Sequence, residues 1–248
     1  MCGFRFDPEF YILNDKEAAL LDFSNAIKNN PRHDKAYYYR GGIKFELKDY
    51  KGALNDFSMA VSIKPDYAYA YNDRGSAKRL LEDVKGALAD YEKAIQIDLR
   101  LALAYNNLAS VKKKLGDYEG AILDYSLAIK IKPDYHLAYN NRGTVRYDKE
   151  DYKGAIEDFG KAIQINPKYA YSYNNRAAAK YKLKDYKGAI QDCSMAIQLN
   201  PDYGYAYLNR GIAKEMIRDA AGACEDWGKA DKLGIKTGKN YVEKDCYE

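Results

Sequence analysis

Amide side chains recur in this sequence at a spacing that suits the binding of a peptide backbone. One or two asparagines appear in each of five copies of a 34-residue pattern, usually just before an arginine. They are Asn72, Asn106, Asn107, Asn140, Asn141, Asn174, Asn175 and Asn209. Each amide offers donor and acceptor atoms, so a row of them matches successive peptide units of an extended ligand. The alternative is that these side chains bridge or cap helices within the fold, or only face solvent.

Basic and acidic residues also recur at fixed positions of the pattern. The basic columns are Arg40, Arg74, Arg142, Arg176 and Arg210, interrupted by Leu108, and Lys44, Lys78, Lys112, Arg146, Lys180 and Lys214. The acidic column is Asp22, Asp56, Asp90, Asp124, Asp158, Asp192 and Asp226. Basic residues four apart share a helix face, and aspartate can accept bidentate hydrogen bonds from arginine. The pattern therefore favours an internal ion-pair network, and leaves open whether each aspartate pairs within its own repeat or with the next.

The remaining reactive side chains form no catalytic or metal-binding pattern. The four cysteines, Cys2, Cys193, Cys224 and Cys246, contain no C-x-x-C pair, and only two histidines, His33 and His136, occur. The sequence also lacks a phosphate-binding glycine loop, a metalloprotease helix motif and a nucleophile elbow. We therefore expect a protein that is not an enzyme and that uses no cofactor or metal.

Two of the cysteines are expected to lie close together. Cys224 stands at a core position of the last full repeat, and Cys246 lies on a predicted C-terminal helix that should pack on that repeat. Two reduced neighbours are favoured, and a disulfide between them is the alternative in an oxidising compartment.

Composition makes several classes of partner less favoured. The net charge is +4, from 40 basic and 36 acidic residues, which argues against nucleic acid. No apolar run reaches the length of a membrane span. The first ten residues lack the apolar core of a signal peptide. A complete chain would be cytoplasmic, and a chain from which a signal peptide was removed would be extracytoplasmic.

The elements that position these residues follow from the 34-residue period. It aligns Tyr37, Tyr71, Tyr105, Tyr139, Tyr173 and Tyr207 in one column. A fixed period of this size predicts a stack of identical units rather than one core. Two sets of positions recur at helical spacing in each unit, which predicts a pair of amphipathic helices. The six full repeats span 34–67, 68–101, 102–135, 136–169, 170–203 and 204–237.

The ends of the chain are less regular. Residues 1–33 resemble a degenerate repeat, with a short helix expected over Pro8–Leu13. Residues 238–248 are expected to form a capping helix that ends the stack. Within the repeats, numbered from position 1, Asp at position 16 should cap the second helix and Pro at position 32 should end it. Small residues at positions 8, 20 and 27 should let the two helices approach closely.

These residues resemble the tetratricopeptide repeat. The first full repeat matches all seven positions of the family pattern, with Tyr37, Gly41, Tyr50, Ala53, Phe57, Ala60 and Pro65. The sequence motifs Y-N-N-R-G and D-Y-K-G-A-I-x-D-F are similar to motifs of tetratricopeptide proteins that are common in bacteria. The resemblance implies an all-α solenoid, a right-handed superhelix of antiparallel helix pairs. It also implies that the first helices line a concave groove, which positions 2, 5, 6, 9, 12 and 13 face.

The resemblance assigns further residues to that groove. They are Tyr69, Tyr171 and Tyr205 at position 2, with Lys113, Tyr147 and Tyr181 at position 12. The asparagine ladder looks like the one that holds peptides in O-linked N-acetylglucosamine transferases. The carboxylate clamp of co-chaperones, in contrast, is absent, because its lysine, asparagine and arginine positions hold other residues.

The sequence thus predicts a non-catalytic scaffold for protein–protein interaction that binds an extended peptide or partner segment. A self-assembling structural repeat protein and a repeat protein for RNA or another anionic polymer are the alternatives. An oligomer is compatible with the sequence.

Overall fold

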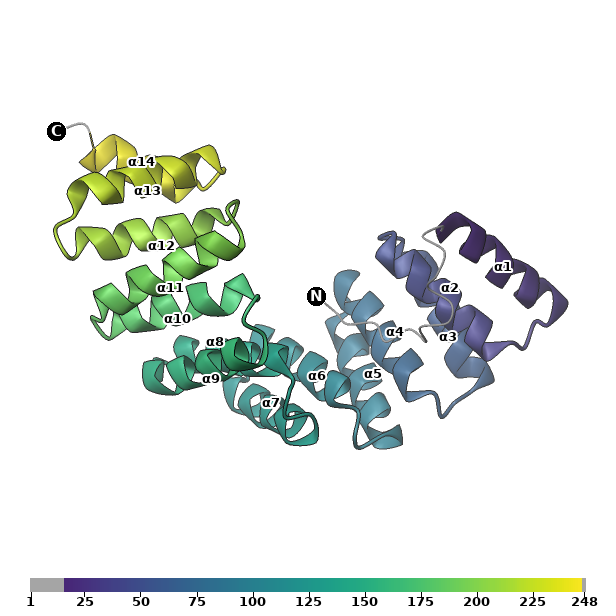
Figure 1. The fold of residues 1–248 in the computed structure, drawn as a ribbon. Coiled ribbons are helices and arrows are strands. Elements are labelled where there is room, and N and C mark those ends of the chain that lie inside the picture. Colours follow the sequence, from purple (N-terminus) through teal and green to yellow (C-terminus); the bar gives the residue numbers. More distant parts are fainter. Residues whose placement is uncertain (1–15, 247–248) are drawn as a thin grey trace. The chain divides into compact units, whose positions relative to one another are not determined.

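The computed structural model describes residues 16–246, and these residues form an all-α repeat solenoid (Figure 1). Fourteen helices and no strand occur in this range. They are α1 (Lys16–Asn29), α2 (Asp34–Glu46), α3 (Tyr50–Ile63), α4 (Ala68–Leu80), α5 (Val84–Ile97), α6 (Ala102–Lys114), α7 (Tyr118–Ile131), α8 (His136–Asp148), α9 (Tyr152–Ile165), α10 (Ala170–Lys182), α11 (Tyr186–Leu199), α12 (Gly204–Glu215), α13 (Ala220–Lys232) and α14 (Lys236–Asp245). The all-α solenoid prediction is confirmed, and the helix expected over Pro8–Leu13 lies outside the described residues.

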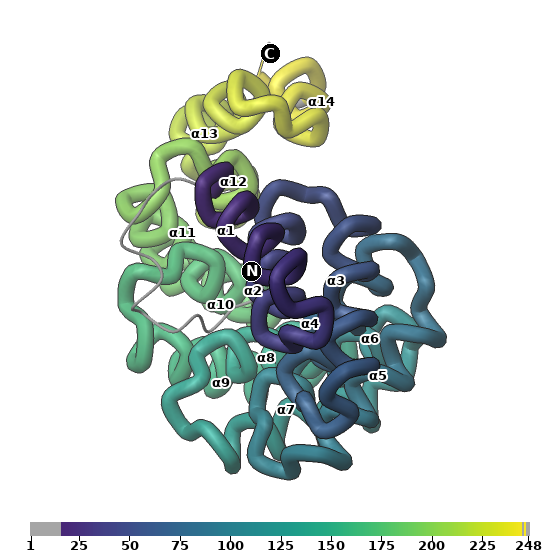
Figure 2. Tube along the Cα trace, turned by 90° about the vertical axis from the view of Figure 1, so that its right-hand side faces the viewer, coloured from purple at the N-terminus to yellow at the C-terminus, as the bar shows by residue number. Residues whose placement is uncertain are grey.

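The described helices are grouped into two compact bodies, one formed by α1 to α7 and the other by α8 to α14. In the N-terminal body, the helices from α2 to α7 form three successive antiparallel hairpins, and α1 packs on α2. In the C-terminal body, α8 to α13 form three more hairpins, and α14 packs on α13 (Figure 2). Each hairpin falls within one of the 34-residue segments defined by the tyrosine column.

An aspartate is the N-cap of the second helix of each hairpin, from α3 to α13, as the sequence predicts. The carboxylate of Asp151, for example, accepts a hydrogen bond from the backbone N–H of Gly154 at 3.0 Å. The same bond recurs for Asp49, Asp83, Asp117, Asp185 and Asp219. A Cβ on Gly154 would overlap the capping carboxylate, so glycine at this position keeps the cap.

Proline turns out not to be required for ending a second helix. α3 ends at Ile63, before Pro65, but α5 ends at the equivalent Ile97 although Leu99 replaces the proline. In the last repeat α13 ends at Lys232, and Gly234 follows with a φ of +83°. This left-handed glycine is a common way of ending a helix.

Small residues bring the two helices of each hairpin together. Gly143 of α8 faces Phe159 of α9 so closely that a Cβ would lie 2.8 Å from the ring. Ala155 and Ala162 of α9 are fully buried in the same hairpin. The predicted packing role of the small-residue columns is confirmed. Each second helix adds one buried aromatic ring to the alanines of the interior, except α11, where Cys193 takes the place of the ring.

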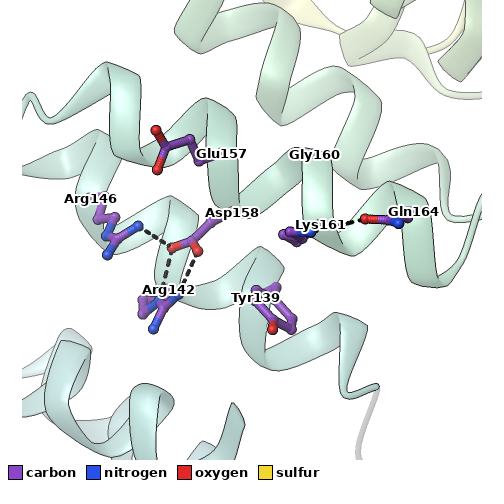
Figure 3. Close-up of a pocket in the computed structure, with 8 residues that line it drawn as sticks. All are labelled: Tyr139, Arg142, Arg146, Glu157, Asp158, Gly160, Lys161 and Gln164. Carbon is purple, nitrogen blue, oxygen red and sulfur yellow. Dashed lines mark hydrogen bonds and ion pairs between the residues drawn. The ribbon is translucent and has the colours of Figure 1, made fainter. Parts of the chain in front are cut away.

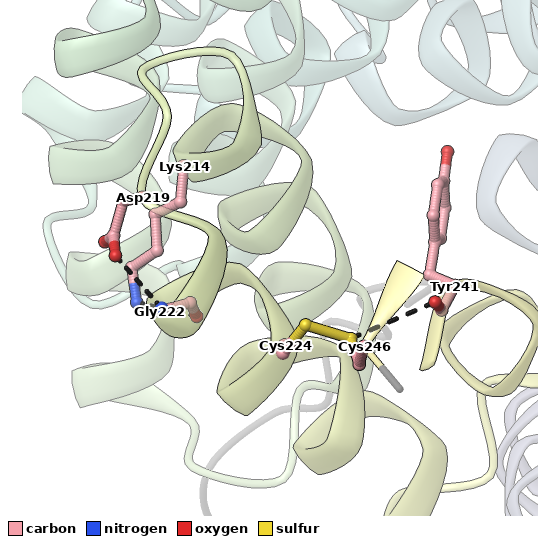
Figure 4. The surroundings of a disulfide bond; sticks show 6 residues. All are labelled: Lys214, Asp219, Gly222, Cys224, Tyr241 and Cys246. Atoms are coloured by element: carbon pink, nitrogen blue, oxygen red, sulfur yellow. Dashed lines mark hydrogen bonds between the residues drawn. A yellow bond between two sulfur atoms is a disulfide. The ribbon is translucent and has the colours of Figure 1, made fainter. Parts of the chain in front are cut away.

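The C-terminal end of the solenoid is closed by α14. The ring of Tyr241 stacks on Trp227 of α13, with the ring centroids 4.5 Å apart. Cys224 and Cys246 form a disulfide bond that joins α13 to the end of α14 (Figure 4). The two cysteines are neighbours, as expected, but the expectation that they are reduced is wrong. The sequence could not decide this, because proximity alone does not fix the redox state of two thiols.

Candidate functional site

The basic and acidic columns pair inside each full repeat. In the repeat 136–169, Nε and Nη2 of Arg142 on α8 donate to the two carboxylate oxygens of Asp158 on α9, at 2.9 and 2.6 Å. Nη1 of Arg146, one helical turn later, lies 3.0 Å from the same carboxylate (Figure 3). The equivalent bidentate pairs are Arg40–Asp56, Arg74–Asp90, Arg176–Asp192 and Arg210–Asp226. The internal network is confirmed in the six full repeats, where each aspartate of the column pairs with a basic residue of its own repeat.

Neighbouring groups hold the arginines in place. The guanidinium of Arg176 lies over the ring of Tyr173, 5.8 Å from its centroid. Hydrogen bonding to Asp192 raises the pKa of Arg176, although burial acts in the opposite direction. Arg210 also reaches the preceding repeat, because its Nη1 donates to Oγ of Ser194 at 3.1 Å. These cations are therefore already engaged, and RNA would have to compete with the buried aspartates.

The repeat 102–135 departs from this arrangement. Leu108 stands where the other repeats have arginine, and it is buried. Nζ of Lys112 lies 2.6 Å from Oδ2 of Asp124. This aspartate is therefore paired with one basic residue, whereas the aspartates of the other full repeats are paired with two. Burial raises the pKa of Asp124, and its hydrogen bond with Lys112 only partly opposes that shift.

A shallow hollow lies beside the ion pairs of the repeat 136–169 (Figure 3). Arg142, Arg146 and Lys161 line it together with Glu157 and Asp158. The two arginines bind Asp158, and Nζ of Lys161 donates to Gln164 at 3.2 Å. The hollow thus offers no cluster of uncommitted positive charge for an anion.

The asparagines join neighbouring repeats. Nδ2 of an asparagine at position 6 donates to Oδ1 of the asparagine at position 5 of the repeat before it. This bond joins Asn107 to Asn72 at 2.9 Å, Asn175 to Asn140 at 3.2 Å and Asn209 to Asn174 at 2.9 Å. Sequence reasoning left open whether these amides hold a ligand or bridge helices, and the contacts are those of bridges.

Burial limits what these amides can offer to a ligand. Asn72, Asn106, Asn107, Asn140 and Asn174 are buried, whereas Asn141, Asn175 and Asn209 are only half-buried. Oδ1 of Asn140 accepts from both Asn175 and Ser172. A peptide-binding role for the buried members would require the bridges to open, and the ladder remains a prediction.

The first junction between full repeats uses a different pair. Asp73 replaces the asparagine at position 6, and its carboxylate accepts a hydrogen bond from the Tyr38 hydroxyl at 2.8 Å. It also accepts from Nδ2 of Asn72 at 2.9 Å. Burial raises the pKa of Asp73 to about 7, while the two hydrogen bonds act in the opposite direction. An ionisable group therefore stands inside this junction.

The predicted groove residues at position 12 are partly used in packing. Tyr147 and Tyr181 are half-buried and contact Tyr152 and Tyr186 of their own hairpins, with ring centroids 5.3 and 5.5 Å apart. Lys113 is half-buried.

The position-2 tyrosines divide into two kinds. Tyr69 is half-buried against the core of the first repeats. Tyr171 and Tyr205, in contrast, are 45% and 57% exposed. These two rings are the predicted groove residues that a ligand could reach without displacing any contact inside the fold.

Sequence reasoning missed two tyrosines that adjoin Tyr171. Tyr169 and Tyr203 precede the first helices α10 and α12, and their rings lie 5.3 and 4.9 Å from that of Tyr171. His136 continues the row, 5.2 Å from Tyr169. The signal was present, because a tyrosine stands at the last position of four repeats, as Tyr67, Tyr135, Tyr169 and Tyr203.

Metal binding, thiol chemistry and membrane spanning have little support within residues 16–246. No group of three or more His, Cys, Asp or Glu side chains in this range could hold a metal ion. The free thiol in this range is Cys193, which is buried, and burial raises its pKa to about 12. No helix in the described part of the chain is long and apolar enough to cross a membrane.

Sequence comparison finds the same repeat along most of the chain. Models described as tetratricopeptide repeat match residues 9–68, 68–100 and 170–203. A model described as TPR repeat matches residues 110–149 and 143–184. A search of curated proteins found no match.

Solved structures share the fold at low sequence identity. A chain of the APC/C hetero-tetramer Cut9–Hcn1 matches with a TM-score of 0.80 and 17% identity over 93% of this chain, which covers 46% of that chain. A tetratricopeptide repeat protein from Parabacteroides merdae matches with a TM-score of 0.71 and 18% identity, over 95% of this chain and 94% of the other.

A third structure is similar over most of its own length. It is YrrB, described as a TPR protein with an unusual peptide-binding site, with a TM-score of 0.58 and 20% identity. The match covers 77% of this chain and 97% of that chain. The repeat geometry and the family matches agree, and the chain belongs to the tetratricopeptide repeat family.

Proposed function

We propose that this protein is a non-catalytic scaffold that binds an extended segment of a partner protein through its first helices. The observation that carries the proposal is the exposure of Tyr171 and Tyr205. Most other recurring polar side chains are already held in ion pairs or hydrogen bonds within the fold. Tyrosine suits such a surface, because its ring is apolar and its hydroxyl can hydrogen-bond.

Several findings support this function over catalysis or nucleic-acid binding. The fold is one that commonly serves as an interaction scaffold, and YrrB, which shares it, is described as peptide-binding. Its 20% identity supports the fold alone, so the site must be argued from this chain. The arginines and lysines that could bind RNA are paired with buried aspartates such as Asp158 and Asp192.

The half-buried asparagines Asn141, Asn175 and Asn209 border this surface in the family's groove numbering. We propose that they contribute secondary contacts at most, because Asn175 and Asn209 already donate to the preceding repeat. Affinity should come from several weak contacts along the surface, with the tyrosines contributing most.

The test is affinity capture from the native source with wild type, two double variants and one single control variant. Partner capture should be lost in Tyr171→Ala/Tyr205→Ala and retained in Tyr118→Ala, which removes an exposed tyrosine on the second helix α7. Asn141→Ala/Asn175→Ala tests the amide ladder directly. Equal capture by wild type and the tyrosine double variant, both folded by circular dichroism, would refute the proposed surface.

A further inference from the structure

The helix α1 has the register and the contacts of a second helix. Its bounds, Lys16–Asn29, fall 34 residues before those of α3. Oγ of Ser24 accepts a hydrogen bond from Nη1 of Arg40 on α2 at 3.1 Å, and Ser194 on α11 accepts the same bond from Arg210 on α12. α1 therefore packs on α2 as the second helix of a full repeat packs on the first helix of the next repeat (Figure 1).

The side of α1 that would face a first helix of its own repeat is only partly covered. In α3 the residues on this side are at most 3% exposed, and they are Ala53, Asp56, Phe57 and Ala60. The equivalent residues of α1 are Ala19, Asp22, Phe23 and Ala26. Asp22 is exposed, and the other three are half-buried. α1 thus keeps the residues of this interface without the burial that the interface gives them in a full repeat.

Asp22 differs from the other members of the acidic column. The six aspartates of the full repeats are 2–5% exposed, and each pairs with a basic residue on the first helix of its own repeat. No basic side chain within residues 16–246 pairs with Asp22. The residues that stand 34 positions before Arg40, Gly41 and Lys44 of α2 are Phe6, Asp7 and Phe10. The sequence before α1 therefore lacks the two cations and the small residue that this interface uses elsewhere.

The full repeats show which kind of helix this interface accepts. In α8, Arg142 and Arg146 are four residues apart, and both contact the carboxylate of Asp158. Gly143, directly after the first arginine, gives the ring of Phe159 room to approach. The complementary helix thus carries basic residues at i and i+4 and glycine or alanine at i+1.

The C-terminal helix of a second copy does not meet this requirement. α14 is a first helix, and Lys244 stands at position 7, where the full repeats except one have arginine. Position 8, however, is Asp245, and position 11 is Glu248. An acidic residue at either position would repel Asp22 rather than pair with it. Charge complementarity therefore favours a helix from a different protein over head-to-tail stacking of this chain.

We propose that α1 is a docking site for a basic amphipathic helix of a partner protein, with arginine or lysine at i and i+4 and glycine or alanine at i+1. The bound helix would complete the first repeat, with its two cations on Asp22 and its small residue against Phe23. Recognition would follow the helix-in-groove mode, in which anchors repeat every three to four residues. This surface lies on the N-terminal body and goes beyond the proposed function, because it uses neither Tyr171 nor Tyr205.

The experiment measures binding of a fluorescein-labelled peptide to the full chain by fluorescence anisotropy. The probe has the sequence of α10, Ala170–Lys182, which presents the required pattern with Arg176, Ala177 and Lys180. Its alanines also favour the helical state. The control peptide carries glutamate in place of Arg176 and Lys180. We expect the probe to bind the wild-type chain at least about tenfold more tightly than the control peptide.

Variants of the chain place the site. Asp22→Ala should lose about tenfold in affinity for the probe, because the charged anchor is removed. Asp66→Ala, which removes an exposed aspartate of the same body, should lose none. Asp22→Lys should reverse the preference, so that the glutamate peptide binds more tightly than the probe. Since Asp22 is exposed, these variants should fold, which circular dichroism checks.

The outcomes separate this inference from the proposed function. No binding of the probe to the full chain, or equal binding by wild type and Asp22→Ala, would overturn the inference. A labelled peptide with the sequence of residues 236–248 that bound as tightly as the probe would assign the surface to a second copy, and this result would also overturn it. Tyr171→Ala/Tyr205→Ala should bind the probe as wild type does, so loss of partner capture by that variant tests the proposed function alone.

Discussion

Nδ2 of Asn107 donates a hydrogen bond to Oδ1 of Asn72, 35 residues earlier, at 2.9 Å. Both amides are buried, so the bond is made where neither group can exchange it for water. The same relationship joins Asn209 to Asn174. A pattern that resembles a binding surface in the sequence therefore contributes to the cohesion between repeats.

Asn209→Ala should destabilise the last repeat junction. The change leaves Oδ1 of Asn174 without its donor, and an unsatisfied buried acceptor costs about 1–3 kcal/mol. Urea denaturation followed by circular dichroism measures the loss. Asn240→Ala, at an exposed site on α14, is the control and should have no effect. An unchanged midpoint in Asn209→Ala would show that the bridge contributes nothing.

Asp192→Ala should cost more than the loss of an amide. It would leave Arg176 and Lys180 without the carboxylate that they now contact, that of the 4% exposed Asp192. Removing one partner of a buried ion pair typically costs about 3–5 kcal/mol. Thermal melting against Asp202→Ala, which alters an exposed turn, provides the measurement. Equal melting temperatures for the two variants would contradict the structural role of the network.

Stability should fall with rising pH because of Asp73. Its pKa is about 7 in the folded protein, above the usual value of 3.8, so folding favours the neutral carboxyl group. This contribution is complete below about pH 4 and is lost as the pH rises through about 7. Asp73→Asn keeps an oxygen that can accept from Tyr38 and cannot ionise. The variant should be more stable than wild type above pH 7 and should lose this pH dependence.

Denaturation midpoints of both proteins between pH 5 and pH 8 would check the Asp73 prediction. Parallel pH profiles for wild type and variant would mean that Asp73 does not titrate in this range. Circular dichroism at pH 5 serves as the control for correct folding of the variant.

Reduction of the disulfide should loosen the C-terminal cap. Cys224 and Cys246 are 22 residues apart, and closing a loop of this length stabilises a protein by about 3 kcal/mol in the chain-entropy description. Trp227, the single tryptophan, stacks on Tyr241 and reports the contact directly. Dithiothreitol should shift its fluorescence to longer wavelength as the ring becomes hydrated. The same reagent should not alter Cys224→Ser/Cys246→Ser, and an identical response would indicate another cause.

The repeats themselves could be predicted because each column reports one local requirement. Asp151 marks a helix start, Gly143 marks a close approach of two helices, and the recurrence of each type fixes the period. The Arg142–Asp158 pairing could be predicted as a network. Its partner choice could not, because an aspartate at position 23 lies near its own repeat and near the next.

The candidate site was less accessible to sequence reasoning. A buried amide bridge and an exposed amide ladder require the same residue at the same spacing, so Asn140 and Asn174 could not be assigned from their column. Tyr169 and Tyr203 were overlooked because they precede the helices. Their importance depends on ring contacts with Tyr171, which only the three-dimensional arrangement reveals.

The bonds within and between repeats join residues that are close in the chain. The bidentate arginine–aspartate pairs span 16 residues and the amide bridges span 35. Such a molecule has a low contact order, and little loop entropy is lost before the first native contacts form. Folding can therefore start in any repeat and spread to its neighbours. A whole repeat could be removed or duplicated at its 34-residue boundaries without changing the kind of contact made by the rest.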